Sequence, residues 1–156
     1  MALLAEARTW QRESGVDVWR PFETSRIEQD LWAGFVFIAK TPEGVCGTVT
    51  LTDSDPLVWD EDGSALYVHK LAASRSVRVP GVGARLLRWA EDVARQRGKR
   101  CLRLDTWDGN RKMREYYERY GFRHVRDRYF AEDSPLPHDY RGTPKSFYQL
   151  DLRESA

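Results

Sequence analysis

The stretch "VRVPGVGARLL", residues 77–87, contains the local pattern around which the other expected elements can be placed. Gly81 and Gly83 stand one residue apart directly behind Pro80, and an unbroken apolar run follows them. A strand-like segment, "ALYVHKLAA" at 65–73, precedes the stretch. At a helix N-terminus free backbone N–H groups point outward and the helix dipole favours negative charge, so a strand, glycines and a helix start are typical of an anion-binding loop.

Two common phosphate-binding loops are excluded by the spacing. No Gly-Lys-Ser/Thr follows the glycines, so the stretch is not a P-loop. No third glycine stands where the dinucleotide-binding fingerprint requires one. Arg75 and Arg78 can add charge-assisted contacts to an anion. Pro80 has no N–H and removes one donor from the loop.

Periodicity places the remaining elements around this loop. We expect helices at residues 3–14, from a cap at Thr24 or Ser25 to Gly34, from the glycine loop to about Arg97, and at 110–120. We expect strands at 35–40, 45–52, 65–73, 101–107, 122–130 and 146–152. This order predicts a single mixed α/β (α+β) domain, residues 1–156, with one central, mostly antiparallel sheet flanked by helices.

Composition limits the classes of function. The chain has 156 residues, with 41% hydrophobic and 31% charged, which suits one soluble domain. The net charge of +1 gives no basic field for a nucleic acid, and no apolar run reaches the length of a membrane span. Cys46 and Cys101 lack metal-binding spacing. We therefore expect a cytoplasmic monomer or homodimer without metal, nucleic-acid or membrane partners.

A second constellation lies downstream of the loop. Asn110 begins the last expected helix, Tyr117 follows seven residues later, and Gly121–Phe122 ends it. Asn at this place is also a natural helix N-cap, and Tyr117 lies on the apolar stripe of its helix, so both residues have ordinary structural explanations. The order of the two constellations along the chain is what favours a functional role.

Together these motifs resemble the GCN5-related N-acetyltransferase (GNAT) family. The family's loop pattern is Gln/Arg-x-x-Gly-x-Gly/Ala, matched by Arg78, Gly81 and Gly83, and its second pattern is Asn, a Tyr seven residues on, and a closing Gly-Phe. The resemblance covers residues 65–130 clearly. It implies a sheet splayed at a coenzyme A (CoA) site. It also implies acetyl-CoA-dependent transfer to a primary amine, directly and through a tetrahedral intermediate.

The resemblance also assigns the residues that bind acetyl-CoA. Backbone amides of the loop hold the pyrophosphate, the preceding strand pairs with the pantetheine arm, and an asparagine bonds that arm. Carried onto this chain, the loop amides are those of Val79, Gly81, Val82, Gly83 and Ala84 with Arg78 as side-chain helper, the strand residues are Leu71 and Ala73, and the asparagine is Asn110.

For catalysis, the resemblance makes Tyr117 the general acid that protonates the leaving thiolate. An alkylamine is mostly protonated at neutral pH, so a base must also help. His69 stands where several relatives carry a glutamate, although a histidine packed in a strand is the ordinary alternative. Asp105 and residues of the acidic loop at 53–64 compete for the base role, namely Asp53, Asp55, Glu61 and Asp62.

The acceptor cleft is expected between the first two helices, the acidic loop and the last strands. Trp19, Trp59 and Asp105 are its expected substrate-binding residues, since aromatic walls with carboxylates suit a cationic small molecule. We therefore predict a small-molecule amine, while amino acids, polyamines, aminoglycoside-like antibiotics and protein N-termini stay open. A CoA-binding or acyl-CoA-binding regulatory module without turnover is the alternative function, and a nucleotide site is a third.

Overall fold

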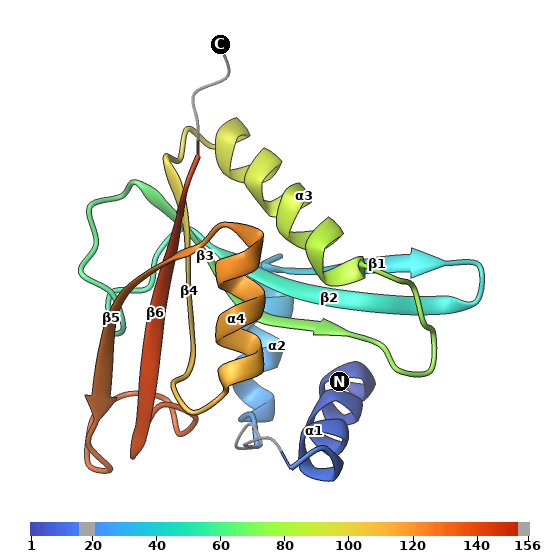
Figure 1. Ribbon diagram of the computed structural model, residues 1–156, viewed down its shortest axis with the longest axis horizontal. Coiled ribbons are helices and arrows are strands. Elements are labelled where there is room, and N and C mark those ends of the chain that lie inside the picture. The colour runs from blue at the N-terminus through green and yellow to red at the C-terminus, as the bar shows by residue number, and fades with distance from the viewer. Residues whose placement is uncertain (16–20, 153–156) are drawn as a thin grey trace.

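The computed structural model describes residues 1–15 and 21–152 (Figure 1). In this part of the chain four helices and six strands follow one another in the predicted order. The helices are α1 (Ala2–Glu13), α2 (Thr24–Trp32), α3 (Val82–Gln96) and α4 (Arg111–Tyr120). The strands are β1 (Val36–Thr41), β2 (Gly44–Thr52), β3 (Ala65–Ala73), β4 (Cys101–Trp107), β5 (Arg123–Phe130) and β6 (Thr143–Asp151).

The strands form one sheet in the order β1-β2-β3-β4-β6-β5, antiparallel except between β3 and β4. The parallel pair is short, joining Ala65–Tyr67 to Cys101–Arg103. Beyond it, β3 pairs only with β2, and β4 pairs only with β6. Figure 1 shows the result, with β1–β3 turning away from β4–β6. The sheet therefore opens in its middle, which confirms the predicted mixed, splayed sheet.

Two apolar clusters hold the sheet from opposite faces. The larger lies under α3, where Leu87, Ala90 and Ala94 are fully buried against the central strands. Alternate strand residues supply the smaller cluster, which includes Tyr67 and Phe147, because successive side chains of a strand face opposite sides. Burial of both faces of the central strands fixes the register of the sheet around its opening.

Several boundaries lie one residue from their predicted positions, and two differences have a clear physical reason. Neither Thr24 nor Ser25 caps α2, because the helix starts one residue earlier and its N-cap is Glu23, without a side-chain cap bond. Strand β6 begins at Thr143 rather than at residue 146, since its first residues pair with the end of β5. Pairing between distant segments extended this strand beyond its local pattern.

Candidate active site

Two cavities lie where the sheet opens. The first, called here the loop cavity, has a volume of about 350 Å³ and is walled by α1, the end of β3, the glycine loop and α4. The second, the central cavity, has a volume of about 420 Å³ and lies between β3, β4, α2 and the loop before β6. Gln11, Leu71 and Met113 line both cavities. The two cavities therefore meet at the divergence of β3 and β4.

The glycine loop presents unpaired N–H groups to the loop cavity. Gly81 is the N-cap of α3 with φ +71°, a left-handed conformation that glycine adopts at little cost, and it provides no side-chain cap. The N–H groups of Gly83 and Ala84 have no acceptor among the residues that the structure describes. Such a terminus is suited to an anion.

Most of the residues predicted to bind the cofactor surround the loop cavity. Its wall includes Leu71, Ala73, Val79, Gly81, Val82 and Gly83. Arg78 does not line it, because its Nε donates 3.3 Å to the carbonyl oxygen of Arg75 and its side chain is exposed. Ala84 contributes no side chain to the wall, so only its backbone N–H fits the predicted role.

Helix α1 closes one side of the loop cavity through contacts that local sequence patterns do not reveal. Glu6 accepts hydrogen bonds from the N–H groups of Arg75, at 2.9 Å, and Ser76, at 2.7 Å. Burial opposes ionisation of Glu6, but hydrogen bonds from Ser76, Arg75 and Ser74 prevail and lower its pKa. The guanidinium of Arg75 also lies 3.9 Å from the ring centre of Trp10, which lines the cavity.

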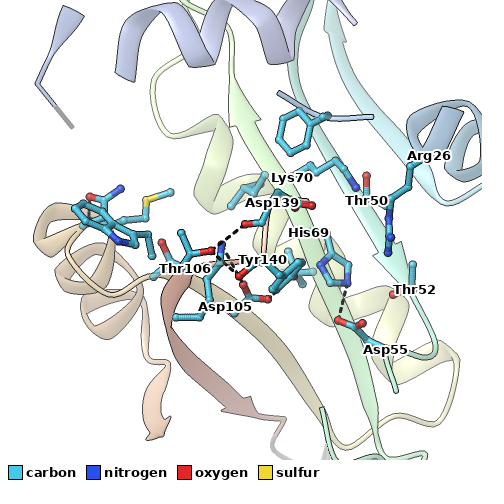
Figure 2. Close-up of a pocket in the computed structure, with 18 of the residues that line it drawn as sticks. Arg26, Thr50, Thr52, Asp55, His69, Lys70, Asp105, Thr106, Asp139 and Tyr140 are labelled. Carbon is cyan, nitrogen blue, oxygen red and sulfur yellow. Dashed lines mark hydrogen bonds and ion pairs between the residues drawn. The ribbon is translucent and has the colours of Figure 1, made fainter. Parts of the chain in front are cut away.

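A histidine–aspartate pair stands in the central cavity (Figure 2). His69 Nε2 lies 3.4 Å from Asp55 Oδ2, and both side chains are largely buried. Burial, followed by the charges of Lys70 and Arg26, lowers the pKa of His69 to about 3. Burial, followed by repulsion from Asp105, raises the pKa of Asp55 to about 7. The imidazole is therefore neutral at physiological pH, and the pair titrates as a unit near neutrality.

A β-bulge brings consecutive residues of β3 into this cavity. The pairing of β2 and β3 shifts register between Thr48 and Thr50, and Lys70 has φ +50°. Neighbouring strand residues normally face opposite sides, yet His69, Lys70 and Leu71 all line the central cavity. The left-handed conformation of Lys70 stores backbone strain that such sites commonly contain. A salt bridge of 3.0 Å from Lys70 Nζ to Asp30 Oδ2 holds its side chain.

The acidic loop reaches His69 because Trp59 anchors it. The carbonyl oxygen of Asp55 accepts hydrogen bonds from the N–H groups of Val58, at 3.2 Å, and Trp59, at 2.9 Å. The Trp59 side chain is buried, 4.8 Å from the ring of Phe147, and lines neither cavity. The prediction that Trp59 lines the acceptor cleft is therefore corrected. Its large apolar surface is buried in the core and fixes the loop.

Asp105 lies at the other end of the central cavity, as Figure 2 shows. Tyr140 Oη donates a hydrogen bond of 2.9 Å to its Oδ1, and Lys145 Nζ lies 4.0 Å from its Oδ2. Burial raises the pKa of Asp105, although the charge of Lys145 opposes this. These partners make Asp105 a constrained carboxylate on the cavity wall. Lys145 has no motif that marks it in the sequence.

Asn110 and Tyr117 line the central cavity beside its junction with the loop cavity. Asn110 Oδ1 accepts the N–H of Met113 at 3.2 Å, so the asparagine is also the N-cap of α4. Tyr117 is 5% exposed and packs edge-on against Tyr116 and Phe122. Burial raises the pKa of Tyr117, which keeps its phenol protonated. Both residues thus combine a structural role with a place on the cavity wall.

Three further expectations from the sequence concern Trp19, a metal site and a membrane span. Trp19 falls outside the described residues. Residues 1–15 and 21–152 contain no group of three or more side chains placed to hold a metal ion. Within the same ranges, no helix has the length and apolarity needed to cross a bilayer.

Comparisons with known proteins agree with this architecture. The family model of the acetyltransferase (GNAT) family matches residues 4–122. The uncharacterized N-acetyltransferase YesJ of Bacillus subtilis (strain 168) is 30% identical over 130 residues, covering 77% of this chain and 72% of that protein.

Solved structures share the fold. A GNAT family acetyltransferase from Listeria monocytogenes 4b F2365 superposes with a TM-score of 0.69 at 22% identity, covering 97% of this chain and 86% of that one. A GNAT family acetyltransferase from Elizabethkingia anophelis, solved with acetyl-CoA bound, gives a TM-score of 0.63 at 20% identity and covers 83% and 84% of the two chains. The splayed sheet, the uncapped glycine loop and the family match together show that this chain belongs to the GNAT family of acetyltransferases.

Proposed function

We propose that this acetyltransferase uses acetyl-CoA to acetylate the primary amine of a small molecule by direct transfer. The observation that carries the proposal is the junction of the two cavities. An uncapped helix N-terminus lies on one side of it, and the buried pair of His69 and Asp55 lies on the other. This arrangement offers an anion site and a proton acceptor on either side of one opening in the sheet.

The residues present fit the proposed cofactor. The unpaired N–H groups of Gly83 and Ala84 suit the pyrophosphate, together with the loop backbone at Val79, Gly81 and Val82. Leu71 and Ala73 lie on the part of β3 that has no partner on its β4 side, so their backbone suits the pantetheine arm. Arg78 is exposed near the loop and can reach a phosphate, while Asn110 lines the central cavity. When bound, acetyl-CoA supplies the acyl group as a reactive thioester.

Two side chains handle the protons of the reaction. The neutral imidazole of His69, backed by the carboxylate of Asp55, accepts the proton that an ammonium must lose before its nitrogen can attack. Tyr117 keeps its proton because of burial and lines the central cavity, so in this proposal it protonates the departing sulfur. Asp55, which the sequence suggested as a competing base, acts in this proposal as the partner of His69.

Direct transfer is favoured over a covalent enzyme intermediate. Cys46 and Cys101 are both buried, and neither lines either cavity. No thiol therefore stands at the junction to attack the thioester. Catalysis then depends on holding the amine and the acyl carbon in contact, with proton acceptor and donor in place.

Thiol release from acetyl-CoA with a panel of amines tests the proposal, alongside calorimetric binding of CoA. We expect tight CoA binding and amine-dependent turnover that His69→Gln lowers by about a hundredfold. His124→Gln is the matched control, because His124 pairs with Asp127 on the surface at 2.8 Å, away from both cavities. Acetyl-CoA binding without turnover on any amine would support the regulatory-module alternative, and absence of CoA binding would support a different phosphate ligand.

A further inference from the structure

Four of the seven Asp, Lys and Arg side chains that line the central cavity form two ion pairs, and the other three are Arg26, Asp55 and Asp139. Lys70 and Asp30 form an ion pair of 3.0 Å, and Lys145 lies 4.0 Å from Asp105. All four of these side chains are largely buried. Each pair is close to electrically neutral, so neither offers a full charge to a ligand.

Arg26 is an exception. It extends from α2 toward Thr52 and His69 at one end of the cavity (Figure 2). Its guanidinium makes no hydrogen bond or ion pair with any residue in the described part of the chain. A guanidinium stays charged and presents a planar set of donors that matches a carboxylate. Arg26 therefore brings an open positive charge to the cavity.

An open acceptor faces the same end of the cavity. Asp55 Oδ2 and Thr52 Oγ1 are buried and have no hydrogen-bond partner in residues 1–15 and 21–152. His69 Nε2 lies 3.4 Å from this Oδ2, but its imidazole is neutral and offers no full positive charge. Buried polar atoms are normally satisfied, so unpaired ones at a cavity wall indicate a missing ligand or water.

Arg26 and Asp55 are oppositely charged and line one cavity, yet they form no ion pair with each other. We propose that the acceptor is a zwitterion that bridges them, an amino acid or a similar molecule whose amine lies a few bonds from a carboxylate. The carboxylate binds Arg26, and the ammonium binds Asp55. This inference rests on the proposed N-acetyltransferase function and narrows its substrate class. A simple alkylamine or diamine would leave Arg26 without a partner.

With its ammonium bound to Asp55, the zwitterion is positioned to react. The ammonium would pass one proton to the pair of Asp55 and His69. The freed nitrogen lone pair would then add to the acetyl carbon, and the carbon–sulfur bond would break as the resulting tetrahedral centre collapses. Tyr117 gives its proton to the departing sulfur, and the second proton from the nitrogen replaces it. The pair releases its proton to solvent. The products are the N-acetylated molecule, which keeps its carboxylate and has lost its ammonium charge, the free thiol of CoA, and one proton.

The test compares free amino acids with their carboxamides, which keep the amine and lose the negative charge. We expect the ratio of kcat/KM for acid over amide to be about tenfold to a hundredfold, the range of a charge-assisted hydrogen bond. Arg26→Gln brings this ratio close to one, and Arg26→Lys restores part of it. Arg119→Gln, an exposed arginine on α4 outside both cavities, leaves the ratio as in the parent enzyme.

Two outcomes overturn the inference. One is an amide accepted as well as its acid. The other is a ratio that Arg26→Gln leaves intact. Calorimetry with the CoA-loaded protein separates this inference from the proposed function. If no amine is acetylated but free amino acids bind more tightly than amides in an Arg26-dependent way, the zwitterion site stands and the transferase proposal fails. If turnover occurs without that preference, the transferase stands and the zwitterion site fails.

Discussion

The substitution Asp55→Asn should stabilise the folded protein and at the same time lower its catalytic activity. The Asp55 side chain is 12% exposed, and its Oδ2 has no hydrogen-bond partner among the described residues. Burial is the main cause of its raised pKa, and repulsion from Asp105 adds to it. Asparagine has nearly the same shape and carries no charge. The variant therefore removes the cost of ionising this carboxyl group in the folded protein.

The magnitude follows from the pKa. Raising it from 3.8 to about 7 makes ionisation cost about 4 kcal/mol more in the folded than in the unfolded chain. Because the folded pKa is the higher one, the folded state keeps the proton longer. The cost is absent below about pH 4, grows as the pH rises, and is complete above about pH 7. Allowing for relaxation around His69, we expect a gain of about 2–4 kcal/mol at pH 8 and almost none at pH 4.

Urea unfolding of parent and variant at several pH values measures the effect. In thermal unfolding, each kcal/mol of added stability should raise Tm by about 2–4 °C for a chain of this size. Asp53→Asn is the control in the same loop. Its carboxylate is 47% exposed and forms surface ion pairs with Arg97 and Lys99, so the change should stay within about 1 kcal/mol.

Activity gives the second readout. The parent's kcat/KM should rise with pH through about 7 as the pair of His69 and Asp55 loses its proton. In Asp55→Asn this rise of kcat/KM with pH should vanish, and the rate at pH 8 should fall about a hundredfold. Two results would refute the assignment of Asp55 as a buried, functionally coupled carboxylate. One is a variant whose stability relative to the parent does not grow between pH 4 and 8. The other is a variant whose kcat/KM still rises with pH through about 7.

Three further substitutions test other parts of the site. Tyr117→Phe should lower kcat by about a hundredfold without changing the Kd of acetyl-CoA, because only a proton donor is lost; an unchanged kcat in steady-state assays would remove Tyr117 from the mechanism. Gly83→Asp should abolish CoA binding in calorimetry, since its Cβ would lie 3.0 Å from Tyr116 Oη and its charge would face the pyrophosphate; retained affinity would contradict the loop assignment. Trp59→Ala should cost about 3–5 kcal/mol in denaturant unfolding; a change confined to the KM of the amine would instead return Trp59 to the acceptor cleft.

Much of the fold was predictable from local signals. Alternating and helical periodicity gave every described element in order, because side-chain direction repeats with a period set by the backbone itself. The glycines of the loop at 79–83 and the spacing from Asn110 to Tyr117 also act over short distances. These signals placed the loop cavity and two residues of the central cavity. The boundary of β6 was missed because pairing with β5, rather than its own pattern, extends that strand.

Local sequence patterns were sufficient to establish the family, the strand–loop–helix unit and the residue types at the opening of the sheet. The tertiary structure alone decided how charges pair, because ion pairs, burial and pKa values depend on neighbours far apart in the chain. Asp55 pairs with His69, and Glu6 accepts a hydrogen bond from Ser76, 70 positions away in the chain. Trp59 is buried in the core rather than exposed in the expected cleft. The bulge at Lys70 likewise arises from pairing between β2 and β3. Local pattern therefore specified the scaffold, and packing of distant segments specified the proposed proton acceptor and the open charges of the candidate site.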